Sequence, residues 1–124
     1  MYLLLDNSNN DKIIWTTGDN EIFEFSSASG VLAGLDQLLK KKKTSLADIE
    51  GLAVVVSKGR FTGARIAVTV VNTLAFALGI STLAVKDDSK DWVNKLRVRP
   101  VGQYVSAQYS APANIGKTKN QSNL

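Results

Sequence analysis

Short apolar runs separated by polar turns fill the first quarter of the chain. Residues 2–5 form an apolar run that ends at Asp6, residues 12–17 (KIIWTT) form a second, and residues 21–25 alternate between polar and apolar. The turns between them contain Asn, Ser, Asp and Gly, which hydrogen-bond locally or tolerate unusual backbone angles. This pattern predicts an antiparallel meander of three strands.

The next segment has the periodicity of an amphipathic helix. Within residues 31–43, the positions on one side of a helical wheel are apolar: Val31, Leu32, Leu35, Leu38 and Leu39. Lysines 40–43 stand at the C-terminal end, where cations interact favourably with the helix dipole. We interpret this run as a solvated helix end; a nucleic-acid patch is the alternative. Residues 45–48 (SLAD) resemble a capping box before the next strand.

Residues 51–86 form the central unit. A β-branched run at 52–56 is typical of a strand buried on both faces, and a polar segment with Gly59 follows it. Thr62 is a suitable N-cap for a helix that continues to about Leu78 and ends at Gly79. A further strand is expected over residues 80–85. A strand–helix–strand unit requires a parallel pair joined by a right-handed crossover.

The pattern weakens beyond residue 86. We expect a short helix around Trp92 within residues 87–96 and extended backbone over residues 97–101 and 104–109. Residues 112–124 are polar and low in large apolar side chains, which is typical of disorder. The sequence therefore predicts a domain over residues 1–96 and an extended, partly disordered C-terminal extension over residues 97–124.

The expected order is β-β-β-α-β-α-β. Three antiparallel strands followed by crossovers to parallel strands make a mixed five-stranded sheet, the connectivity of the α/β ribonuclease H-like fold. Nucleases and the actin, Hsp70 and sugar-kinase group share this fold, so it assigns no function by itself.

Composition removes several classes of chemistry. The 124 residues are 44% hydrophobic, carry a net charge of +4 and contain no cysteine or histidine. Disulfides, thiolate nucleophiles, zinc fingers and Ser-His-Asp triads are therefore excluded. No apolar run has the length of a membrane span, and we expect a cytoplasmic protein.

Acidic residues are too sparse for a two-metal nuclease, which needs several converging carboxylates. Asp6 ends the first strand, but the central strand ends in Ser57 and Lys58, and the first helix offers only Asp36. Residues 58–63 precede a helix, where backbone amides and the helix dipole favour an anion, so a phosphate-binding loop is one interpretation. We favour a tight loop and close helix–strand packing as the reason for its glycines, with a nucleotide site at Asp6 and Lys58 as the alternative. No metal or cofactor is predicted.

The central helix has two distinct sides. The broad side that can cover the sheet is apolar: Ala64, Ala67, Val68, Val71, Leu74, Ala75 and Leu78. The narrower opposite stripe contains Thr62, Arg65, Thr69, Asn72, Thr73 and Phe76. The two helices should lie on the same face of the sheet and present a surface for two helices of a partner.

Residues 30–85 resemble the TsaB (YeaZ) family, bacterial proteins needed to make threonylcarbamoyladenosine in tRNA. The segment GRFTGARIAVT is similar to the family pattern GPGSFTGLRIG, with Gly59, Phe61, Thr62, Gly63, Arg65 and Ile66 matching. LAFALGIS resembles the family's helix end, and LLLDNS its first strand. Ser57, Lys58 and Arg60 depart from the pattern, and the second half of a typical member is missing.

The resemblance implies a non-enzymatic partner subunit with a degenerate nucleotide site. It implies binding to TsaD, the subunit that transfers the threonylcarbamoyl group, a larger complex with a TsaE-like ATPase, and at most indirect contact with tRNA. It also implies that the residues in or near the interface are Leu35, Leu39, Arg65, Thr69, Asn72, Thr73 and Phe76. Two alternatives stay open, a homodimer of unrelated role and a minimal nucleotide-binding protein that uses Asp6 and the 58–62 loop.

Overall fold

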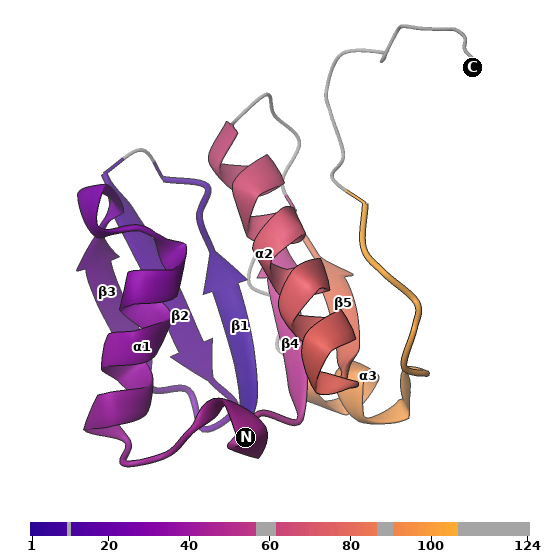
Figure 1. Cartoon of the computed structure of the whole chain (residues 1–124). Coiled ribbons are helices and arrows are strands. Elements are labelled where there is room, and N and C mark those ends of the chain that lie inside the picture. The colour runs from indigo at the N-terminus through magenta and orange to yellow at the C-terminus, as the bar shows by residue number, and fades with distance from the viewer. Residues whose placement is uncertain (10, 57–61, 87–90, 107–124) are drawn as a thin grey trace, which may run out of the picture.

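The structure, a computed structural model, describes residues 1–9, 11–56, 62–86 and 91–106 (Figure 1). Its strands and helices are, in chain order, β1 (Tyr2–Asp6), β2 (Lys12–Thr17), β3 (Ile22–Ser26), η1 (Ser27–Ser29), α1 (Val31–Lys41), η2 (Leu46–Asp48), β4 (Gly51–Val55), α2 (Thr62–Leu78), β5 (Ser81–Val85) and α3 (Trp92–Val98). The five predicted strands and the two main helices are all present. Their order confirms the predicted connectivity.

The five strands form one mixed sheet in the order β3-β2-β1-β4-β5. The meander β1-β2-β3 is antiparallel, and β1, β4 and β5 are parallel. Strand β1 therefore lies at the centre, between the hairpin partner β2 and the crossover partner β4. This arrangement confirms the mixed sheet of the ribonuclease H-like fold.

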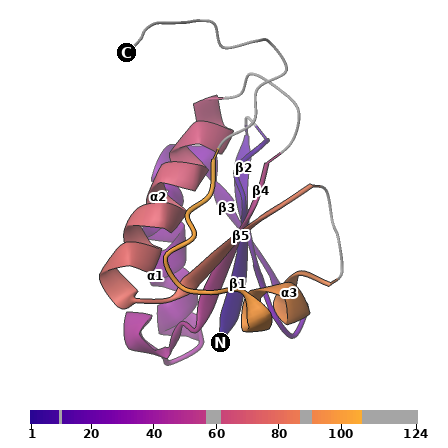
Figure 2. The same ribbon diagram turned by 90° about the vertical axis from the view of Figure 1, so that its right-hand side faces the viewer.

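Helices cover both faces of the sheet. In Figure 2, α1 and α2 lie on one side of the strands and α3 on the other. The main core cluster joins both long helices to inward residues of the strands, such as Leu3 and Leu52, and a second cluster places Leu4 and Ala53 against α3. Alternate residues of β1 and β4 thus enter opposite cores, as expected for strands buried on both sides.

The end of α2 agrees with the sequence prediction. The helix finishes at Leu78, and Gly79 has a φ of 67°, the left-handed conformation that glycine adopts without steric cost. Its broad apolar side packs on the sheet, with Ala67 and Val71 fully buried.

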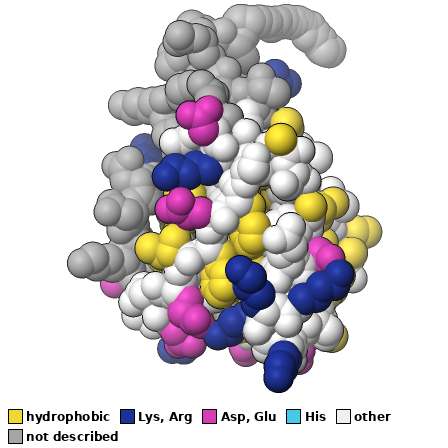
Figure 3. All heavy atoms as spheres, turned by 90° about the vertical axis from the view of Figure 1, so that its left-hand side faces the viewer, with side chains coloured by type: hydrophobic (Ala, Val, Ile, Leu, Met, Phe, Trp, Pro, Cys, Tyr) yellow, Lys and Arg dark blue, Asp and Glu magenta, His cyan; other side chains and the backbone are white. Residues whose placement is uncertain are grey.

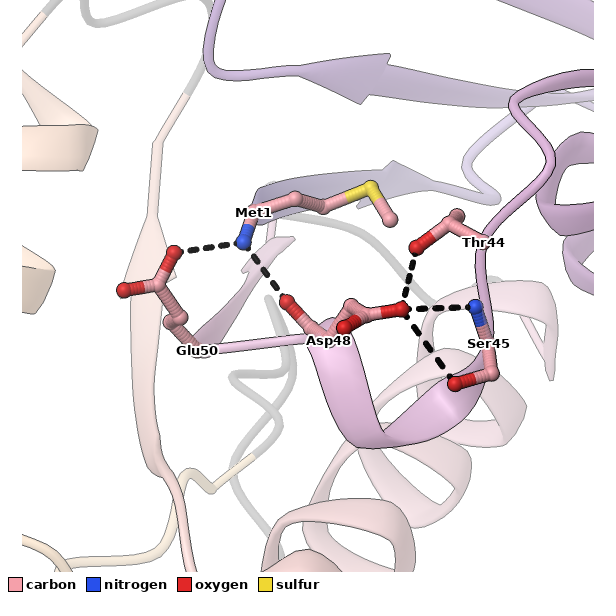
Figure 4. Close-up of polar contacts among 5 residues, drawn as sticks. All are labelled: Met1, Thr44, Ser45, Asp48 and Glu50. Carbon is pink, nitrogen blue, oxygen red and sulfur yellow. Dashed lines mark hydrogen bonds and ion pairs between the residues drawn. The ribbon is translucent and has the colours of Figure 1, made fainter.

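A set of polar contacts ties the start of β1 to the turn before β4 (Figure 4). The ammonium group of Met1 donates to the backbone oxygen of Asp48 at 2.7 Å and to the Glu50 carboxylate at 2.6 Å. The Asp48 carboxylate accepts from Thr44 Oγ1 and from the backbone N–H of Ser45. The predicted capping box at residues 45–48 is therefore confirmed.

The predicted short helix around Trp92 is present, but the prediction is wrong at Arg97 and Val98. Extended backbone was expected from Arg97, but α3 continues to Val98. Leu96 is 1% exposed and Trp92 4%, so both anchor this helix on the sheet. The helix therefore continues for two residues beyond Leu96, through Arg97 and Val98. Residues 99–106, which we call the strap, have no regular secondary structure. The predictions for residues 107–124 lie outside the described residues.

Among the described residues, no helix is both long enough and apolar enough to cross a membrane.

Candidate functional site

The carboxyl end of β1 is the first candidate site. Asp6 closes the strand, and its Oδ1 accepts hydrogen bonds from the backbone N–H and the hydroxyl of Ser8, at 3.0 and 2.6 Å. A carboxylate that bonds a backbone N–H two residues on is an Asx turn. Asp6 therefore shapes the turn that leads out of the sheet.

The start of α2 lies against this turn. Asn7 Nδ2 donates to the backbone oxygen of Gly63 at 2.9 Å, and a Cβ atom on Gly63 would stand 2.3 Å from the backbone oxygen of Asn7. Only glycine allows this approach, because a real Cβ atom essentially never comes so close to another heavy atom. The observation supports our interpretation of this glycine as a requirement of helix–strand packing.

A cavity of about 250 Å³ opens beside this contact. It lies between the β1–β2 turn and the first residues of α1 and α2, and its lining includes Asn7, Ser8, Gly30 and Gly63. The predicted residues Lys58, Gly59, Arg60 and Phe61 and the Thr62 side chain lie outside the described part of the structure.

Asp36 does not line this cavity. It lies on the exposed side of α1 and forms an ion pair with Lys40 at 3.0 Å. In the described ranges, no group of three or more acidic, cysteine or histidine residues could hold a metal ion.

The outward stripe of α2 is the second candidate site. Arg65, Thr69, Thr73 and Phe76 are exposed, and Phe76 is 77% exposed, which is high for a large aromatic side chain. The Thr69 hydroxyl bonds the Arg65 carbonyl within the helix. Arg65 is the only charged residue among the 17 residues of α2. An exposed helix face with so little charge is typical of a protein contact surface.

The neighbouring helix α1 carries the two leucines that the resemblance places in or near the interface. Leu35 and Leu39 are only 2% and 7% exposed, and both belong to the main core. They can serve a contact surface only by holding α1 in place. Besides Phe76, the exposed large apolar side chains of these two helices include Leu32 on α1, at 56%, and Ile66 on α2, at 48%.

The β3 edge of the molecule has a different character. Charged side chains of both signs lie among apolar ones on this face (Figure 3). Residues of β3, or directly before it, form the ion pairs Lys12–Glu24 and Lys42–Glu21. Mixed charge of this kind is typical of solvated surface and protects an edge strand from pairing with another chain. The α2 stripe differs from this edge because it is nearly uncharged.

Sequence reasoning missed one neighbour of this stripe. Asn72 is half-buried because the strap lies against it, and the Tyr104 ring contacts Phe76 with centroids 6.5 Å apart. Tyr104 is 46% exposed. No local pattern links residues 72 and 105, which are 33 positions apart, so no signal in the sequence alone could have found this contact.

The architecture defines the class of protein. A mixed sheet in this order, with two helices on one face and a third on the other, is a single domain of the kind found in actin, Hsp70 and the sugar kinases. Comparison with known proteins narrows the class. A family model described as "TsaD: tRNA N6-adenosine threonylcarbamoyltransferase" matches residues 28–107, and the chain belongs to this family as a YeaZ (TsaB)-like protein.

Two solved structures from Pseudomonas aeruginosa are similar to it. One is YeaZ, with 30% identity and a TM-score of 0.57 over 69% of this chain and 44% of that chain. The other, described as an uncharacterized protein with similarity to peptidase YeaZ, has the same identity and TM-score over 69% of this chain and 43% of that chain. This chain thus spans less than half of the length of these relatives. No curated protein sequence matches it.

Proposed function

We propose that this chain supports threonylcarbamoyladenosine modification of tRNA at position 37 as a non-catalytic subunit that binds a TsaD-like protein in the cytoplasm. Family membership over residues 28–107 and 30% identity to YeaZ support the pathway. Binding to a partner is a separate step of the proposal, because this chain corresponds to less than half of each relative.

The observation that carries the partner-binding step is the exposed stripe of α2. Phe76 lies near the C-terminal end of the stripe, and the face around it is nearly uncharged. Burying an exposed aromatic ring removes a large apolar area from water, at about 25 cal/mol per Å². Aromatic side chains are also enriched among the residues that dominate binding energy at interfaces.

The carboxylates support a non-catalytic role. Asp6 is engaged by Ser8 in the turn after β1, and Asp36 pairs with Lys40 on the surface of α1. In the part of the chain that the structure describes, neither of these contacts brings a second acid to the carboxyl end of β1, where a two-metal nuclease needs one.

The test is co-purification with the TsaD-like protein of the same organism at micromolar concentration, followed by titration calorimetry. Phe76→Asp should raise the dissociation constant at least about tenfold, because a charge would be buried without a partner. Val98→Asp is the matched control: Val98 is 82% exposed and lies on α3, on the opposite face of the sheet. Absence of a complex, or equal effects of both substitutions, would refute the proposal.

Self-association through the same stripe is the second candidate. The same exposed residues can pair with a second copy of the chain around a two-fold axis. Sedimentation velocity of the purified chain separates the two cases. A dimer that Phe76→Asp dissociates, without any complex with the TsaD-like protein, would favour the homodimer.

A further inference from the structure

The strap follows α2 on the side away from α1 (Figures 1 and 2). Two polar side chains from other elements hold it. Asn72 of α2 accepts from the backbone N–H of Val105 at 3.0 Å and donates to the Val105 carbonyl at 2.9 Å. Thr82 of β5 donates to the carbonyl of Gln103 at 3.0 Å. Val105 itself is 8% exposed and belongs to the main core.

Asn72 uses both ends of its amide on the strap. Its oxygen and its nitrogen each engage the backbone of one residue, as a neighbouring β-strand would. The side chain was predicted to lie in or near the partner interface, and these two bonds add a role within the chain. It fixes where the strap lies relative to α2.

The fixed strap brings a second aromatic ring to the stripe. Tyr104 and Phe76 are tilted at 53° with centroids 6.5 Å apart, and Asn72, Thr73, Phe76 and Tyr104 line a shallow, open groove between helix and strap. The strap leaves the stripe open, since Phe76 remains 77% exposed. It therefore extends the surface of α2 and does not cover it.

We infer that Asn72 is a positioning residue that holds the strap so that Tyr104 joins Phe76 in one docking groove for the TsaD-like partner. The inference rests on the proposed function. No residue that lines the groove is charged, so the complementary part of the partner is an uncharged, largely apolar surface. Three hydrogen bonds hold the strap in place in the free protein. Binding therefore loses little conformational entropy from ordering the strap.

The test is a double-mutant cycle on the full chain, with the dissociation constant for the TsaD-like protein as readout. Asn72→Leu and Tyr104→Ala should each raise that constant about five- to tenfold, the range expected for losing a hydrogen bond or an aromatic contact. The double variant should bind no more weakly than Tyr104→Ala alone, since Asn72 acts through Tyr104. Thr82→Val loosens the strap without changing the face of α2 and should also weaken binding.

Amide hydrogen exchange at Val105 reports the strap independently of any partner. Both Asn72→Leu and Thr82→Val should accelerate it, because each removes a bond that holds the strap. Additive effects in the cycle would show that Asn72 contacts the partner directly and would overturn the inference. Unchanged binding in Thr82→Val would also overturn it, as would tighter binding in any loosened variant, which would identify the strap as a competitor for the face.

The two proposals fail in different ways. If the wild-type chain and all variants do not bind the TsaD-like protein, the proposed function is wrong and the docking role of the groove is lost with it. If the wild-type chain binds and the strap variants bind equally well, the proposed function stands and the inference about Asn72 is wrong.

Discussion

The contact between Gly63 and Asn7 allows a quantitative prediction for Gly63→Ala. The new methyl group would stand 2.3 Å from the backbone oxygen of Asn7, about 1 Å inside ordinary contact, so the helix start and the β1–β2 turn must separate. Overpacking of this kind costs about 1–3 kcal/mol. The hydrogen bond from Asn7 to the Gly63 carbonyl would be stretched, at a cost of about 1 kcal/mol.

One effect opposes this loss. Alanine is a better helix former than glycine by about 1 kcal/mol in a helix interior, and by less in the first turn. The net destabilisation should be about 1–3 kcal/mol, which corresponds to a melting temperature lower by about 4–12 °C for a domain of this length.

Urea unfolding followed by tryptophan fluorescence measures this change. Trp15 and Trp92 are buried in the clusters on opposite faces of the sheet, so their signals report both cores. Thr73→Ala, an exposed substitution in the same helix, is the control and should change stability by less than about 0.5 kcal/mol. A Gly63→Ala protein as stable as the wild type would refute the argument for close packing.

Three further predictions concern stability. Gly79→Ala should cost about 1–2 kcal/mol in thermal unfolding, because φ at this position is 67°. Leu96→Ala should cost about 2–5 kcal/mol in urea unfolding, since Leu96 is 1% exposed and its loss leaves a cavity under α3; a smaller loss would show that α3 contributes little. The hydrogen bonds from Thr44 and Ser45 hold the pKa of Asp48 below its ordinary 3.8. The stabilisation from Asp48 is therefore present above pH 3.8 and lost as pH falls through its lower pKa in the folded state. Asp48→Asn should be less stable than wild type above pH 3.8, and the difference in free energy of unfolding should shrink as the pH falls below that value. A difference that stays constant with pH would contradict the assignment.

Local signals predicted most of the fold. Strands β1, β2 and β4 were visible as short apolar runs. The sequence also placed the start of α2 at or next to Thr62 and its end before Gly79, as the structure has them. The continuation of α3 through Arg97 and Val98 was missed, because their alternation with Arg99 mimics an exposed strand while burial of Trp92 and Leu96 decides the conformation.

The candidate site was predicted less completely than the fold. The helical period separated the exposed stripe of α2 from its buried side, and the structure places Thr73 and Phe76 on the exposed side as predicted. The two hydrogen bonds between Asn72 and the strap form only because the chain returns to α2 after β5 and α3. Contacts between residues far apart in sequence leave no periodic signal, so only the folded chain shows them.

The central position of β1 has a consequence for synthesis on the ribosome. Its hairpin partner β2 follows within a few residues, but its other neighbour, β4, begins only at Gly51. Until residues 51–55 emerge, β1 is an unprotected edge strand of a three-stranded sheet. Leu3 and Leu5 then lack the core contacts that β4 and the later elements provide. The slow step of folding should therefore be closure of this long parallel pair, and the nascent chain is most prone to aggregate just before it.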